Sequence, residues 1–154
     1  MNRRIDCDAE PFVPEGWTVL GHSKGGILEW DSGKALLFTC AEQKDVLPVA
    51  ADEVHAQVLR VGVPVMNAHV LDHLLQNPEL IPITPEHMKK WDCVCGAAIL
   101  FWGTLYLNED GETVVRGLAG DDEGKWDWAA IAMTSGINDS FPAAVWKVPQ
   151  AQAA

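Results

Sequence analysis

The stretch "ILFWGTLYLNEDGETVVRGL", residues 99–118, decides the fold of this chain. Residues 99–107 are almost wholly apolar, residues 108–111 are turn formers, and residues 113–118 are again rich in β-branched and apolar side chains. Two such segments around a short turn of Asn, Asp and Gly are typical of a β-hairpin. We therefore expect two antiparallel strands, at 99–107 and 113–118.

The same pattern continues toward the C-terminus. A second acidic turn at 120–124 precedes residues 125–133, where Trp126 and Trp128 would share one face of a strand. Residues 145–148 favour a closing strand. The C-terminal half is therefore predicted to form an antiparallel β-meander.

Upstream of this meander, the apolar period changes from that of a strand to that of a helix. Residues 51–61 place apolar side chains at helical spacing, and Gly62 ends the segment. A second helix begins after Asn67, a favourable N-cap, and a third, shorter one from Thr84, with Pro85 at its first position. The apolar stripe of the second helix consists of Ala68, Leu71, Leu74 and Leu75. We expect the two longer helices to cover one side of the meander.

The N-terminal part predicts a hairpin of its own. Residues 27–30 and 35–40 have strand character, and the turn formers at 31–34 would reverse the chain between them. This hairpin precedes the helices in the chain.

Residues 1–15 are polar and flanked by proline, so we expect them to lie over the surface, anchored by Phe12 and Val13. Residues 149–154 are expected to be a disordered tail. The chain as a whole, 1–154, is predicted to be a single α+β domain. It combines an N-terminal β-hairpin, two or three short helices, and a C-terminal antiparallel β-meander packed on the helices.

Composition limits the classes of partner. The chain has 154 residues, with 11 Lys plus Arg against 22 Asp plus Glu and a formal net charge of -11. Phosphate backbones repel so negative a chain unless its cations gather on one face, and the sequence indicates no such gathering. We therefore expect neither nucleic acid nor a membrane as a partner. Because no apolar run reaches the ~18 residues of a membrane span and no signal peptide begins the chain, we expect a cytoplasmic protein.

Residues 21–25 match the G-x-S-x-G pattern of a serine hydrolase. That pattern works where a sharp turn from a strand into a helix lifts the serine above a sheet, but a strand is predicted at 27–30, soon after Ser23. Only 22 residues precede Ser23, too few for the strands and the oxyanion loop that a hydrolase sheet needs first. We interpret the match as accidental, and hydrolysis at Ser23 is the least favoured function.

A zinc site is the alternative to inert cysteines. The chain has four cysteines, Cys7, Cys40, Cys93 and Cys95. Cys93 and Cys95 would point to the same face of a strand, and His69 and His73 are spaced i, i+4 on the second helix. The histidines lie opposite the leucines of that helix, so we favour reduced structural thiols and solvent-facing histidines. We expect no metal and no cofactor.

Seven tryptophans are many for a chain of this length. Within residues 99–107 the face that carries Trp102 and Tyr106 is nearly as apolar as the opposite face, so both need cover. Helices can shield one face; the N-terminal hairpin, a ligand or another subunit must cover the other. The candidate ligand or interface residues are Trp102, Tyr106, Trp126, Trp128 and Arg116.

One block of the sequence resembles a set of uncharacterised bacterial proteins. It consists of "VMNAHVLDHLLQNPELIP" at 65–82 and "ILFWGTLYLNEDGETVVRGLAGDDEGKWDW" at 99–128. The shared pattern is an N-A-x-V-L-D-x-L-L helix, then L-I-P, then F-W-G-T-x-Y and paired tryptophans. The resemblance covers 65–128, less than half of the chain, and implies a shared C-terminal module. It implies no activity and no site residue.

These observations favour a non-enzymatic binding or interaction domain that acts through the aromatic sheet surface and self-associates. The acidic turns favour cationic or neutral partners. The partner is then a second copy of the chain or another protein, for example a basic toxin that this acidic chain masks. The alternative function is a small-molecule-binding protein for an apolar or cationic ligand. Its pocket would lie between helices and sheet and would be lined by Trp102, Tyr106, Trp126 and Trp128.

Overall fold

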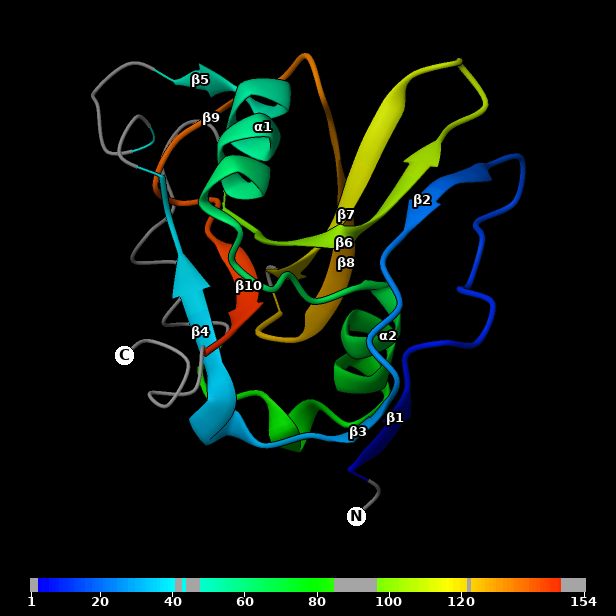
Figure 1. Ribbon diagram of the computed structural model, residues 1–154, viewed down its shortest axis with the longest axis vertical. Helices are drawn as coiled ribbons and strands as arrows, with labels where there is room; N and C mark the ends of the chain where they lie inside the picture. Colours follow the sequence, from blue (N-terminus) through cyan, green and yellow to red (C-terminus); the bar gives the residue numbers. More distant parts are fainter. Residues whose placement is uncertain (1–2, 41–42, 44–47, 85–96, 122, 148–154) are drawn as a thin grey trace.

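The predicted α+β architecture is confirmed by a computed structural model, which describes residues 3–40, 43, 48–84, 97–121 and 123–147 (Figure 1). The strands are β1 (Arg4–Asp6), β2 (Thr18–His22), β3 (Ile27–Glu29), β4 (Ala35–Phe38), β5 (Val49–Ala50), β6 (Ile99–Leu107), β7 (Thr113–Gly120), β8 (Trp126–Ala132), β9 (Gly136–Ile137) and β10 (Ala143–Trp146). The helices are α1 (Ala51–Val61) and α2 (Ala68–Gln76), with 3₁₀-helices at Ser32–Lys34 and Pro78–Leu80.

The largest sheet of the described residues contains six strands. Its order is β4-β10-β6-β7-β8, and β2 also pairs with β6. Strand β7 pairs antiparallel with both β6 and β8, which confirms the predicted meander. The turn between β6 and β7 is closed by Asn108, whose side-chain oxygen accepts hydrogen bonds from the backbone N–H groups of Asp110 and Glu112. Strand β10 does not extend the meander; it lies between β4 and β6.

Two strands and a crossing segment share one edge of β6. Strand β2 pairs with the second half of β6, and β10 pairs with it at Leu100. Between these two strands, residues 66–67 approach the backbone of β6, and the N–H of Gly103 donates to the carbonyl oxygen of Met66 at 2.9 Å. A Cβ on Gly103 would lie 2.8 Å from the Cα of Asn67, so the approach requires a glycine.

A β-bulge in β6 changes which of its side chains share a face. Leu100 pairs with Gly117 and Leu105 pairs with Val115, so β6 advances five residues while β7 advances two. The difference of three is odd, and it inverts the alternation of side chains along β6. The expectation that Trp102 and Tyr106 share a face is therefore wrong.

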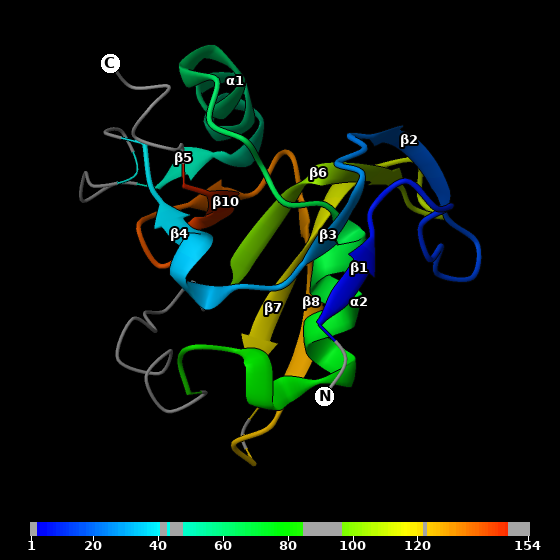
Figure 2. The same ribbon diagram turned by 60° about the horizontal axis from the view of Figure 1, so that its bottom comes forward.

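The two helices cover opposite faces of the sheet rather than the same side. Helix α2 packs on the face of Phe101 and Leu118, whereas α1 packs on the face of Leu100 and Trp102. In Figure 2 strand β6 runs between the two helices. The expected bounds of both helices are confirmed, with the side chain of Asn67 capping α2. Neither face of β6 therefore needs another subunit to cover it.

The N-terminal antiparallel pair is formed by other strands than expected. Strand β3 pairs with β1, and β4 pairs with β10, so the predicted pairing of 27–30 with 35–40 is wrong. Asp31 accepts a hydrogen bond from the N–H of Gly33 and opens a 3₁₀-helix in place of a hairpin turn. The strand residues on either side consequently take separate partners.

The first residues contribute to the core as well as to the surface. Ile5 and Cys7 are 4% and 2% exposed, whereas the expected anchors Phe12 and Val13 are 48% and 41% exposed. The strand pairing of β1 with β3 brings this segment against α2. The expected tail at 149–154 and the short helix expected after Thr84 lie outside the described residues. Among the described helices, none has the length and apolar character to cross a membrane.

Candidate functional site

Three of the residues predicted for the site lie together on the α2 face of the sheet. The Cζ of Arg116 lies 4.5 Å from the ring centre of Trp128 and 6.0 Å from that of Tyr106. Phe12 adds a third ring at 5.1 Å. Because aromatic ring faces attract cations, these three rings hold the guanidinium group of the chain itself.

The same guanidinium group forms a bidentate ion pair with Asp72 on α2. Nη2 of Arg116 donates to Oδ1 of Asp72 at 2.8 Å, and Nη1 donates to Oδ2 at 3.2 Å. The side chain of Arg116 is 2% exposed, and that of Asp72 is 23% exposed. We call Arg116, Asp72, Phe12, Tyr106 and Trp128 the Arg116 cluster.

Tyr106 ties the N-terminal segment to this cluster. Its hydroxyl donates to the carbonyl oxygen of Phe12 at 2.8 Å, and its ring lies 5.6 Å from that of Trp17. Burial raises the pKa of Tyr106 above its usual value of 10, although Arg116 acts in the opposite direction through both a hydrogen bond and its charge. Two of the four rings predicted to line a pocket for an apolar or cationic ligand, Tyr106 and Trp128, therefore contact a cation of the chain itself.

The other two predicted residues lie elsewhere. Trp126 is partly buried and packs on the α2 side of the sheet, as its face shared with Trp128 predicts. Trp102 is 3% exposed and packs against α1 on the opposite face. A single pocket lined by Trp102, Tyr106, Trp126 and Trp128 is therefore not formed.

A hollow of about 260 Å³ lies beside Trp102, and we call it the Trp102 hollow. Its lining comes from strand β2, helix α1, strand β6 and two connecting segments. Its lining residues are Gly21, His22, Ser23, His55, Val58, Leu59, Val65, Trp102, Gly103 and Leu105. The lining is mostly apolar with a few polar groups, which is the composition of small-molecule sites.

Trp102 and His55 form the aromatic wall of this hollow. Their rings are stacked, with centres 5.0 Å apart and planes inclined by 17°. Nε1 of Trp102 is buried and has no hydrogen-bond partner among the described residues. Burial lowers the pKa of His55 below its ordinary value of 6.5, so its ring is neutral at pH 7.

The lowered pKa of His55 predicts a dependence of stability on pH. Below pH 6.5 the unfolded chain takes up a proton at His55 more readily than the folded chain, so the free energy of unfolding falls as pH drops through the folded pKa. His55→Phe keeps a ring against Trp102 and removes this titration. Urea unfolding at pH 7.5 and pH 5 is expected to show a smaller loss for the variant. An equal loss in both proteins would contradict the assignment.

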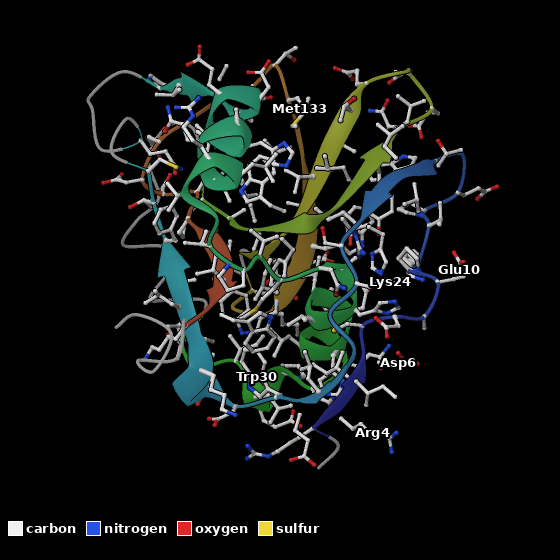
Figure 3. The ribbon with its side chains drawn as sticks, in the orientation of Figure 1. Arg4, Asp6, Glu10, Lys24, Trp30 and Met133 are labelled. Atoms are coloured by element: carbon white, nitrogen blue, oxygen red, sulfur yellow. The ribbon has the colours of Figure 1, made fainter. Side chains whose placement is uncertain are left out.

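A second depression shares two lining residues, Ser23 and Val65, with the Trp102 hollow. Its volume is about 640 Å³, and we call it the lysine cleft. It is lined by Cys7, Ser23, Lys24, Gly25, Leu28, Glu29, Lys34, Val63, Pro64, Val65, Asn67, Val70, Trp146 and Lys147. Figure 3 marks Lys24 on the connection between β2 and β3, close to α2 in this view.

Buried hydrogen bonds hold the segments that border both depressions. Asn67 donates from Nδ2 to the carbonyl oxygens of Ser23 and Cys7, at 3.0 and 3.2 Å. Oγ1 of Thr104 accepts from the N–H of Ala68 at 2.9 Å and lies 2.8 Å from Nδ1 of His22. The loop at Ser23 is therefore fixed to both β6 and the start of α2.

Ser23 lacks the setting of a nucleophile elbow. Strand β2 ends at His22, and the next element is strand β3 rather than a helix. Both ring nitrogens of His22 are engaged, one with Thr104 and the other with the carbonyl oxygen of Cys7 at 3.1 Å. The strand–turn–helix geometry that exposes a catalytic serine is absent at this position.

The histidines of the alternative zinc site are half-buried, not solvent-facing as expected. The ring of His69 lies 5.3 Å from that of His22, and its Nε2 donates to the carbonyl oxygen of Ala9 at 2.7 Å. Cys93 and Cys95 lie outside the described residues. No group of three or more potential metal ligands occurs within the described residues. Cys7 is buried, and burial together with the charges of Asp8 and Asp6 raises the pKa of its thiol.

The sequence predicted no site role for His55, Lys34 or Lys147. One signal was present in the sequence: a glycine inside an apolar strand, Gly103, indicates a bulge or a close backbone approach. A comparison with known proteins found no match among family models, curated proteins or solved structures. The resemblance to uncharacterised bacterial proteins therefore stays a prediction.

Proposed function

We propose that this protein is a non-enzymatic binding protein for a small molecule, and that the Trp102 hollow is its site. The observation that carries the proposal is the buried indole N–H of Trp102, which has no partner among the described residues. An unpaired buried donor costs about 1–3 kcal/mol. A ligand acceptor that reached this N–H, once the atoms that cover it had moved aside, would remove that cost on binding.

The neighbouring groups suit a flat, uncharged ligand part. His55 is half-buried and neutral at pH 7, while Val58 and Leu105 supply apolar surface. The stacked pair of His55 and Trp102 offers an aromatic wall against which a second ring can pack. These features favour an aromatic or compact aliphatic group with one hydrogen-bond acceptor.

Self-association through the aromatic sheet has less support. Tyr106 and Arg116 are 0% and 1% exposed, and Trp102 is almost as well buried, so their rings and charge are used within one chain. A protein–protein interface needs such anchors to reach the partner. Self-association stays a prediction, and hydrolysis at Ser23 stays the least favoured function.

Phenylacetamide, a neutral molecule with one ring and one carbonyl acceptor, tests the proposal. In a ¹H–¹⁵N NMR titration it is expected to shift the amide signals of Gly21, Ser23 and Gly103. Trp102→Phe keeps an apolar ring but removes the donor, and the loss of one hydrogen bond is expected to weaken binding about three- to tenfold.

Trp126→Phe is the matched control, because Trp126 lies on the opposite side of the sheet. It is expected to bind phenylacetamide as the unchanged protein does. Chemical-shift changes that are absent, or that spread without reference to the Trp102 hollow, would show that the site is misassigned.

A further inference from the structure

The lysine cleft is lined by lysines that lie far apart in the sequence. The described residues contain four lysines, Lys24, Lys34, Lys125 and Lys147, and three of them line this one cleft. The chain as a whole carries a formal net charge of -11. A local gathering of cations in so acidic a chain marks a place where an anion is attracted.

The three lysines come from separate segments that the fold brings together. Lys34 ends a 3₁₀-helix, and the N–H of Lys147 donates to its carbonyl oxygen at 2.7 Å. Lys24 lies on the connection between β2 and β3 and also lines the cleft. The arrangement therefore depends on the tertiary structure and not on a basic run in the sequence.

The acidic groups near the cleft offset only part of this charge. Glu29 also lines the cleft, but it lies opposite Arg4 in the pairing of β1 with β3. Asp8 accepts a hydrogen bond from the N–H of Gly26 at 2.9 Å, so one of its oxygens is engaged. Three cations against one lining carboxylate leave the cleft locally positive.

We propose that the lysine cleft binds the anionic end of a small organic oxyanion whose apolar end occupies the Trp102 hollow. The two depressions share the lining residues Ser23 and Val65, and the proposed ligand passes over these two residues from one depression into the other. The Ser-Lys-Gly loop that resembles a hydrolase motif then contributes a hydroxyl group and a cation to oxyanion binding. This inference rests on the proposed function for the apolar end of the ligand.

Matched acids and amides test the inference. The probes are ω-phenyl carboxylates with one to five methylene groups, each paired with its primary amide, and the corresponding phosphonates. NMR titration gives the dissociation constant of each. The best acid is expected to bind about tenfold more tightly than its amide, because charge-assisted contacts to several lysines add up. A preference for phosphonate over carboxylate would identify a phosphate group as the natural anion.

Lys34→Met and Lys147→Met are expected each to lower the ratio of acid to amide affinity about two- to fivefold. Lys125→Met is the control, because Lys125 is exposed in the turn between β7 and β8 and lies away from the cleft. It is expected to leave the ratio unchanged. Trp102→Phe is expected to weaken acid and amide equally.

The outcomes separate this inference from the proposed function. Amides that bind at the Trp102 hollow as tightly as their acids would overturn the anion site and leave the proposed function intact. An acid preference that survives both lysine substitutions would also overturn it. If neither acids nor amides bind, both proposals fail.

Discussion

Asp72→Ala is expected to lower the free energy of unfolding by about 3–5 kcal/mol, the usual cost of leaving one member of a buried ion pair without its partner. The side chain of Arg116 is 2% exposed, and its guanidinium group donates two hydrogen bonds to Asp72. Its Nε has no partner among the described residues, so Asp72 carries most of the compensation for its burial. Urea denaturation measures the difference.

Removal of the other member of the ion pair is expected to lower the free energy of unfolding much less. Arg116→Met replaces the cation with an apolar chain among aromatic rings, and the remaining carboxylate of Asp72 is 23% exposed and reaches water. The variant is expected to lie within about 1 kcal/mol of the unchanged protein. In the double variant Arg116→Met/Asp72→Ala, most of the loss caused by Asp72→Ala should disappear. Additive losses in the double variant would show that the ion pair is not the cause.

Gly103→Ala is expected to destabilise the fold by about 3 kcal/mol, at the upper end for overpacking of a core. The added Cβ would lie 2.8 Å from both the Cα of Asn67 and the carbonyl oxygen of Met66. Both are backbone atoms of residues 66–67, a segment that the hydrogen bond from the N–H of Gly103 to the carbonyl oxygen of Met66 holds against β6. Relief would have to move the start of α2, which Asn67 caps.

Gly21→Ala is the matched control for this prediction. Gly21 lies on β2, which pairs with the same half of β6, and a Cβ there would meet no atom within 4 Å. Its stability is expected to change by no more than about 1 kcal/mol. Thermal and urea unfolding of the two variants should therefore differ clearly. If Gly103→Ala were as stable as Gly21→Ala, the crossing would not be as rigid as its distances imply.

The aromatic pair Trp102 and Tyr106 and the three lysines of the cleft show why the candidate sites could not be found from sequence patterns. Trp102 and Tyr106 are four residues apart and would share a face of a regular strand, but the bulge in β6 separates them. Lys24, Lys34 and Lys147 have no common pattern in the sequence. Lys34 and Lys147 come together only when β4 pairs with β10, and Lys24 lines the cleft from the connection between β2 and β3. Long-range pairing of this kind has no signal within a short window of residues.

The sequence by itself determined the elements whose causes are local. Helical spacing with Gly62 as its end defines α1, Asn67 begins α2, and the turn at 108–111 joins β6 to β7. Such features depend on hydrogen bonds and apolar contacts within a few residues of the chain.

Only the tertiary structure decided which strands pair, which face each helix covers and where cations meet. Strand β3 pairs with β1 and not with β4, and Arg116 contacts Tyr106 and Trp128, two of the rings that were predicted to line a ligand pocket. The physical reason is that strand pairing and packing are chosen by the best burial available anywhere in the chain. Several segments of similar apolar character could pair with the same strand or pack on the same face. A local sequence pattern therefore does not predict which of them does so.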